Sequence, residues 1–182
     1  DAEESQYDML KKLELPASWH LELKNHAERL GITFISTAFD LKSLSFLETL
    51  DLPLYKIPSG EITNAPLLKA FARTGKNVIL STGMTTLSEV EQALAILAWG
   101  YLRNDEPKSL SAVWEHWSHN DAAQIIRSKV SLLHCTSQYP TPISEVNLKA
   151  MDTLAAAFHL PVGYSDHTGG LLIPIAAVSR GA

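Results

Sequence analysis

The fold is decided by residues 54–83, which read LYKIPSGEITNAPLLKAFARTGKNVILSTG. Each end of this stretch is a short run rich in aliphatic and aromatic residues that stops at a small polar cluster. Between the two runs, residues 66–74 have the apolar spacing of an amphipathic helix, and Gly75 is a suitable residue to end it. The stretch therefore predicts a strand, a helix and a second strand, which is the repeating unit of parallel α/β proteins.

The same unit recurs along the whole chain. Five runs are predicted as strands, at residues 32–37, 54–60, 77–83, 130–136 and 161–167, and further helices are predicted at residues 19–30, 41–50, 86–98, 147–158 and 171–179. The helix at residues 86–98 has the clearest start, because Thr86-Leu87-Ser88-Glu89 forms a capping box. Most of the runs are nearly continuous in apolar residues, which favours strands buried on both faces of a sheet.

Two architectures fit this alternation, an open doubly wound sheet and a closed (β/α)8 barrel. No G-x-G-x-x-G follows any run, so the main sign of a dinucleotide-binding sheet is missing. The sequence therefore predicts an α/β fold of the (β/α)8 TIM-barrel type. Because such barrels have eight strands and typically about 250 residues, we expect the 182 residues to be an incomplete barrel that covers about strands 3 to 7.

Residues 99–124 interrupt the pattern and read as an insertion, with three of the four tryptophans and two of the seven histidines. His116 and His119 are three residues apart, so they could share a helix face and hold a metal ion. A solvated histidine pair beside packing tryptophans is the favoured interpretation.

The composition excludes several functional classes. A net charge of −5 without a basic run argues against nucleic acid and anionic membranes as partners. No apolar stretch approaches the roughly 18 residues of a membrane span, and the acidic start DAEESQYD is unlike a signal peptide. The single cysteine, Cys135, cannot form an internal disulfide, so we predict a cytoplasmic protein.

The carboxyl ends of parallel strands form the ligand-binding edge of an α/β fold. The polar residues that end the five runs should therefore converge, and they are Ser36, Thr37, Asp40, Lys56, Ser59, Glu61, Ser81, Thr82, Gly83, His134, Thr136, Ser137, Tyr139, Ser165, Asp166 and His167. One lysine among many hydroxyl groups suits an anionic, oxygen-rich substrate such as a phosphate.

Lys56 lies within an apolar run, where an unpaired ammonium group is costly. We interpret it as a ligand for a phosphate or carboxylate, or as a Schiff-base lysine of the kind found in aldolases. The alternative is an internal salt bridge with Glu61 or Asp166.

His167 follows the last run, where an imidazole could bind a metal, move a proton or only support the structure. His134 is interpreted as a core or supporting histidine and Cys135 as a small buried residue. Two prolines after Tyr139 should hold that tyrosine over a pocket.

The segments FISTAFD, YKIPSGEITN, VILSTGM, LLHCTSQYPTP and GYSDHTGG, in this order, resemble the N-acetylneuraminate (sialic acid) synthase family. This family includes the legionaminate, pseudaminate and spore-coat polysaccharide synthases. The resemblance runs from about Ser5 to Ala182, interrupted by the insertion, and therefore makes residues 1–182 part of a sialic acid synthase-like TIM-barrel domain.

The resemblance implies a transferase that condenses phosphoenolpyruvate with an N-acylmannosamine-type sugar to give a nine-carbon 2-keto acid and phosphate, with C–O cleavage. It also implies a divalent metal, Mn²⁺ or Mg²⁺, and a homodimer in the full-length protein. Residues matched to the family's substrate site, or placed beside it at the strand ends, are Lys56, Ser59, Thr37, Ser81, Ser137, Tyr139, Ser165 and Asp166. Glu61 and Lys56 are the predicted catalytic residues, and His167 is the predicted metal ligand.

The sequence also departs from the family pattern. The motifs of the family's first, second and eighth strands do not occur in these residues, nor does its C-terminal antifreeze-like domain, and Ala38 replaces a common proline. Two alternatives therefore stay open: a Schiff-base aldolase that uses Lys56, and an inactive barrel fragment that only binds phosphate or sugar.

Overall fold

A computed structural model describes residues 5–182, which divide into two compact units at Ile35 and Ser36. The first unit contains two helices, α1 (Gln6–Leu13) and α2 (Ala17–Arg29). His20 of α2 is buried against the edge of the Phe34 ring.

The second unit is an α/β layer of four strands and seven α-helices among the residues that the structure describes. The strands are β1 (Leu54–Ile57), β2 (Asn77–Ser81), β3 (Val130–His134) and β4 (Val162–Tyr164). The helices are α3 (Leu41–Glu48), α4 (Ala65–Arg73), α5 (Leu87–Leu102), α6 (Leu110–Trp117), α7 (Asn120–Lys129), α8 (Lys149–Phe158) and α9 (Leu172–Ser179). Two short 3-10 helices, Ser59–Glu61 and Ile143–Glu145, complete it.

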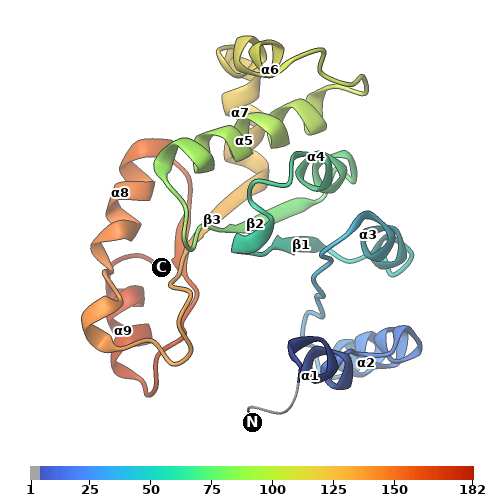
Figure 1. Cartoon of the computed structure of the whole chain (residues 1–182), viewed down its shortest axis with the longest axis vertical. Helices are drawn as coiled ribbons and strands as arrows, with labels where there is room; N and C mark the ends of the chain where they lie inside the picture. Colours follow the sequence, from blue (N-terminus) through green and yellow to red (C-terminus); the bar gives the residue numbers. More distant parts are fainter. Residues whose placement is uncertain (1–4) are drawn as a thin grey trace. The chain divides into compact units, whose positions relative to one another are not determined.

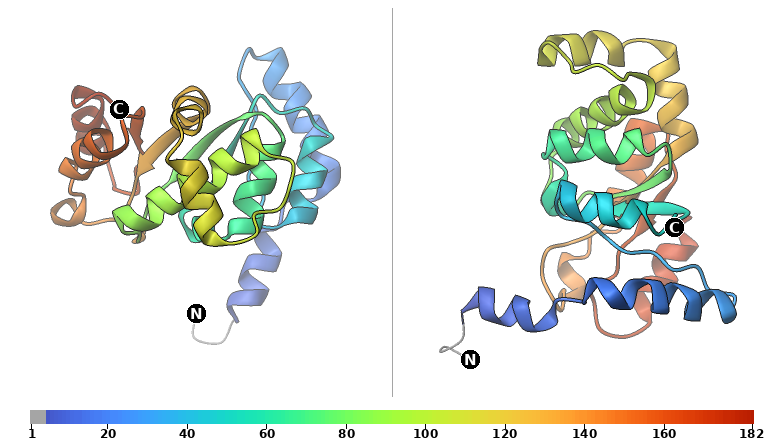
Figure 2. Two further views of the ribbon diagram at one scale, coloured as in Figure 1. Left: turned by 90° about the horizontal axis from the view of Figure 1, so that it is seen from above. Right: turned by 90° about the vertical axis from the view of Figure 1, so that its right-hand side faces the viewer.

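The four strands form one parallel sheet in the order β1-β2-β3-β4, so each strand pairs with the next one along the chain. Each crossover contains at least one helix, as parallel pairing requires. The α/β class and four of the five predicted strands are thereby confirmed. The insertion accounts for α6 and the start of α7, and α6 packs on α5 and α7, farther from the sheet than α5 (Figure 1). Figure 2 shows the same succession of helices from two further directions.

The predicted strand at residues 32–37 is wrong: no strand is assigned there, and Ile32 and Ile35 are exposed. A strand exists only where a partner completes its hydrogen bonds, and β1 pairs only with β2 among the described residues. An apolar run alone therefore does not make a strand.

The predicted burial on both faces of the sheet is also wrong. One face is the core, where Tyr55, Leu80 and Leu132 are at most 1% exposed. The alternate residues, including Lys56 and Ile79, are only half-buried. The sheet thus has a closed face under the helices and a more open face that carries Lys56.

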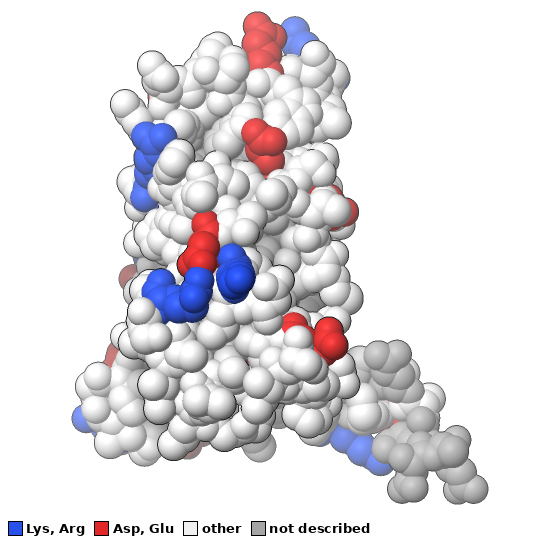
Figure 3. All heavy atoms as spheres, turned by 90° about the vertical axis from the view of Figure 1, so that its left-hand side faces the viewer, with Lys and Arg blue, Asp and Glu red and all other residues white. Residues whose placement is uncertain are grey.

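On the face shown in Figure 3, acidic and basic side chains are interspersed among uncharged ones, and neither sign forms a continuous patch. None of the helices in residues 5–182 is long and apolar enough to span a membrane.

Candidate functional site

The carboxyl ends of the strands carry the polar side chains, as the sequence predicts. A groove of about 530 Å³ opens at the ends of β2 and β3, between the N-terminal turns of α5 and α8. Thr82, Thr86, His134, Cys135 and Lys149 are among its lining residues. We call this side of the sheet the carboxyl edge.

Ser59 links three strand ends at the carboxyl edge. Its hydroxyl accepts a hydrogen bond from the Gly83 amide at 2.8 Å and lies 3.2 Å from Cys135 Sγ. There is no room for a side chain at Gly83, because a Cβ there would lie 2.9 Å from Cys135 Sγ and 3.0 Å from Ser59 Oγ. Neither the role of Gly83 nor the contact of Cys135 with Ser59 was predicted from the sequence, although the predicted burial of Cys135 is confirmed. The sequence signal that could have revealed this close packing is a glycine, Gly83, directly after an apolar strand.

A second group forms around His167. Its Nε2 lies 2.9 Å from the Tyr139 hydroxyl and 3.2 Å from Ser165 Oγ, and the rings of Tyr139 and His167 stack with centroids 4.0 Å apart. The backbone ties the two loops together, since the Thr141 amide donates to the His167 carbonyl at 2.7 Å. Tyr139 is therefore held by a stacking contact, with 73% of it exposed.

Several buried polar atoms at this edge lack a partner. Within residues 5–182, four buried side-chain polar atoms have no hydrogen-bond partner, and three of them belong to Ser81, Tyr164 and His167. Burial raises the pKa of Tyr164, which keeps its phenol neutral. Buried polar atoms are normally satisfied by protein, water or ligand. Ser81 and His167 thus have unused hydrogen-bonding or ligating capacity beside the strand ends.

Lys56 and Glu61 lie at the end of β1, and no ion pair joins them among the described residues. No ion pair of Lys56 occurs in the part of the chain that the structure describes, so the alternative interpretation, a salt bridge with Glu61 or Asp166, is not found. Glu61 instead accepts a hydrogen bond from Asn64 Nδ2 at 2.8 Å, and Asp166 accepts from the Thr168 amide at 2.9 Å.

Thr37, Ser137 and His134 are the remaining residues at the predicted strand ends. Thr37 is half-buried in the segment before α3, and Ser137 is exposed in the loop after β3. His134 donates from Nε2 to the Val146 carbonyl at 2.8 Å, which agrees with its interpretation as a supporting residue.

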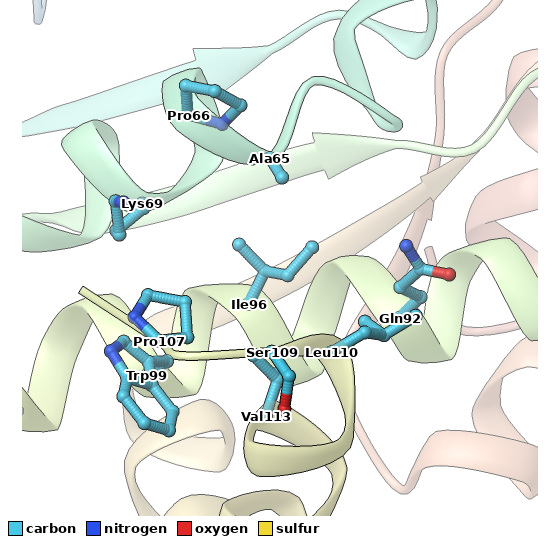
Figure 4. Close-up of a pocket in the computed structure, with 10 residues that line it drawn as sticks. All are labelled: Ala65, Pro66, Lys69, Gln92, Ile96, Trp99, Pro107, Ser109, Leu110 and Val113. Atoms are coloured by element: carbon cyan, nitrogen blue, oxygen red, sulfur yellow. The ribbon is translucent and has the colours of Figure 1, made fainter.

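A second cavity, of about 280 Å³, lies in the helical layer (Figure 4). It is lined mainly by apolar side chains of α4 and α5 and of the insertion, including Ile96, Trp99 and Leu110. Lys69 also lines it, but its ammonium group pairs with Glu106. The cavity therefore has no free charge from Lys69 with which to bind an anion.

The sequence pattern of the NeuB family matches residues 1–182. The chain belongs to the NeuB family.

Three known proteins are similar to this chain. An N,N'-diacetyllegionaminic acid synthase of Campylobacter jejuni is 48% identical over 99% of this chain and 47% of its own length. The synthase of the same name from Legionella pneumophila is 44% identical over 98% of this chain and 44% of its own length. The crystal structure of N-acetylneuraminic acid (sialic acid) synthetase from Leptospira borgpetersenii, in complex with citrate, superposes with a TM-score of 0.77 and 34% identity over 96% of this chain and 52% of that one. The chain spans about half the length of these relatives.

Proposed function

We propose that this NeuB chain contributes to a synthase that condenses phosphoenolpyruvate with an N-acylmannosamine-type sugar. The observation that carries the proposal is the family match over residues 1–182. The polar carboxyl edge supports it, because hydroxyl groups and one unpaired lysine suit a phosphate-bearing substrate. We further propose a 2,4-diacetamido sugar, since the relatives that are 48% and 44% identical are both named N,N'-diacetyllegionaminic acid synthases.

The proposed roles follow the positions of the side chains. Lys56, half-buried and without an ion pair among the described residues, binds the phosphate of phosphoenolpyruvate. Glu61 is the active-site carboxylate. The hydroxyl groups and Asp166 hold the substrates, and this set comprises Thr37, Ser59, Ser81, Ser137, Tyr139, Ser165 and Asp166. The Gly83 amide fixes the orientation of Ser59 within this set.

The reaction balances with water as the third reactant. Carbon 3 of phosphoenolpyruvate attacks the sugar aldehyde, which forms the new C–C bond. Water then adds at carbon 2, and the bond from carbon 2 to the phosphate oxygen breaks. The products are the nine-carbon 2-keto acid and phosphate.

A divalent metal, Mn²⁺ or Mg²⁺, belongs to this proposal, with His167 as one ligand. The buried His167 Nδ1 without a partner is a suitable donor. It offers one ligand only, since no cluster of three His, Cys, Asp or Glu side chains in residues 5–182 includes His167. The described residues therefore do not complete a metal site at this edge, and no step is assigned to the metal.

We also propose the larger setting of the chain. In it, β1 to β4 are consecutive strands of a (β/α)8 barrel, of which the described residues form only a part. The half-buried face that carries Lys56 supports this, since the interior of a barrel is completed by all eight strands. The full-length protein would act as a cytoplasmic homodimer.

The experiment is phosphate release from phosphoenolpyruvate by the full-length protein, with and without Mn²⁺. The sugars are N-acetylmannosamine, its 6-phosphate and the 2,4-diacetamido sugars. Release that needs the metal and is fastest with a diacetamido sugar is expected. Absence of release with every sugar would refute the proposal.

The Schiff-base aldolase is not favoured by the relatives, which are named synthases. Borohydride reduction in the presence of a keto acid separates the two reactions. A covalent adduct on Lys56 would support the aldolase, and the synthase forms none.

A further inference from the structure

The fourth unpartnered buried polar atom lies in the insertion and belongs to none of the residues that form the carboxyl edge. It is Nε2 of His116, a residue only 6% exposed at the end of α6. His116 packs edge-on against Trp99, with ring centroids 5.4 Å apart. The prediction of a solvated pair is therefore wrong for His116, because the tryptophan-rich packing buries it, whereas His119 is exposed.

Two further donor groups adjoin this imidazole. His119 is the N-cap residue of α7, and its ring centroid lies 5.9 Å from that of His116. Asp121 lies in the first turn of α7. One ligand atom from each of the three residues lies within 4.8 Å of the other two.

We propose that His116, His119 and Asp121 bind a divalent transition-metal ion, for which Zn²⁺ is the best match. Two imidazoles and one carboxylate are a typical three-residue zinc set, in which water takes the fourth position. A tetrahedral zinc ion holds its ligand atoms about 3.3 Å apart, so the side chains need to close by about 1.5 Å at most. The exposed His119 and Asp121 are free to make this movement.

The electrostatics of the cluster also suit a cation. Burial lowers the pKa of His116, whereas the Asp121 charge opposes this effect and favours a positive charge in the cluster. Arg103 also lies near His116 and opposes a cation, but its guanidinium pairs with Asp105 at 3.1 Å. Asp121 Oδ1 accepts a hydrogen bond from the Ala122 amide at 2.9 Å, which leaves Oδ2 for the ion.

The bound ion joins the end of α6 to the start of α7. This site is separate from the proposed metal ligand His167, so the two can be tested independently. The test is a titration of the metal-free full chain with Zn²⁺, in which calorimetry measures binding. A second titration uses Co²⁺ as a substitute ion, whose visible absorption reports its coordination. Both titrations are made in the parent and in His167→Ala, which lacks the proposed ligand at the carboxyl edge.

The parent and His167→Ala should both bind one Zn²⁺ at this cluster, and binding should raise Tm. His119→Ala and Asp121→Asn change exposed residues and should fold normally, yet each should weaken Zn²⁺ affinity at least about tenfold in either background. The control is His26→Ala, an exposed histidine of α2, which should bind as the parent does.

Three results would overturn the proposal: no Zn²⁺ binding by His167→Ala, unchanged affinity in both His119→Ala and Asp121→Asn, or an equal loss in His26→Ala. Phosphate release is measured separately, so failure of the zinc site leaves the proposed synthase reaction untouched.

Discussion

Gly83 at the carboxyl edge and Gly100 in α5 both lack room for a side chain, but their neighbours differ. At Gly83 the nearest atoms are Cys135 Sγ and Ser59 Oγ, which are the ends of short side chains that can rotate. This close approach lets the Gly83 amide reach the serine hydroxyl. The missing side chain therefore serves the arrangement of the candidate site.

At Gly100 the neighbours belong to α4. A Cβ there would lie 2.7 Å from Ala72 Cβ and 2.8 Å from the Lys69 backbone oxygen, and a helix backbone cannot rotate away. The missing side chain here sets how closely α4 and α5 pack. Similar crowding at the two glycines therefore has different consequences, for the arrangement of the candidate site at Gly83 and for helix packing at Gly100.

The largest effect is expected from Gly100→Ala. Overpacking against the backbone of α4 should outweigh the roughly 1 kcal/mol gained in helix propensity and lower the free energy of unfolding by about 3 kcal/mol. Urea unfolding measures this. In the Ala72→Gly background the loss should be only partly relieved, because the Lys69 oxygen remains. Gly60→Ala, which has open space around it, is the control, and equal stability of the Gly60 and Gly100 variants would refute the packing argument.

Next in size is Lys56→Ala, which tests the carboxyl edge alone. Loss of a charged contact to phosphate should reduce kcat/KM by about 30- to 150-fold, equivalent to about 2 to 3 kcal/mol, with little change in Tm. The assay is phosphate release by the full-length protein. Lys42→Ala, an exposed lysine of α3, should react as the parent does. An unchanged kcat/KM in Lys56→Ala would remove Lys56 from the site.

A smaller effect is expected from Gly83→Ala. Rotation of Ser59 and Cys135 should limit the loss of stability to about 1 to 2 kcal/mol. In a double-mutant cycle with Ser59→Ala, the cost of Gly83→Ala should fall, because one of the two crowded atoms is gone. Additive losses in the cycle would show that Ser59 is not what crowds Gly83.

Much of the fold follows from the sequence alone. The strands β1 to β4 lie within their predicted runs, and α5 begins directly after Thr86, the N-cap of the predicted capping box. These features depend on residues near one another in the chain. The same reasoning wrongly predicts a strand at residues 32–37, because a strand also needs a hydrogen-bonding partner, which the local sequence pattern does not reveal.

In the candidate site, too, some features follow from the sequence and others depend on contacts between distant residues. The topology of an α/β fold predicts that polar strand ends meet, but not which ones touch. Tyr139 and His167 are 28 residues apart, and their stacking depends on how two loops fold back. Likewise, the burial of His116 results from contact with Trp99 on another helix, which the spacing of histidines does not reveal.

The smallest effect is expected at Thr86, where α5 starts beside the groove and runs toward Gly100. The Thr86 amide donates to Glu89 Oε2 at 2.7 Å, and the Glu89 amide donates to Thr86 Oγ1 at 3.3 Å. Thr86→Ala should therefore lower the free energy of unfolding by about 1 kcal/mol, as measured by urea unfolding.

The pH dependence separates the two halves of this cap. Hydrogen bonds from Thr86 lower the pKa of Glu89 below 4.5. A carboxyl group whose pKa is lowered in the folded state stabilises that state at pH values above the ordinary carboxyl pKa. This contribution disappears as the pH falls through the lowered pKa of the folded state. Glu89→Gln keeps a side chain that can close the capping box but cannot titrate, so its stability should fall less steeply in acid than that of the parent. Equal acid sensitivity of the two proteins would mean that Glu89 does not act through its charge, and the stability of α5 would then depend mainly on its packing around Gly100.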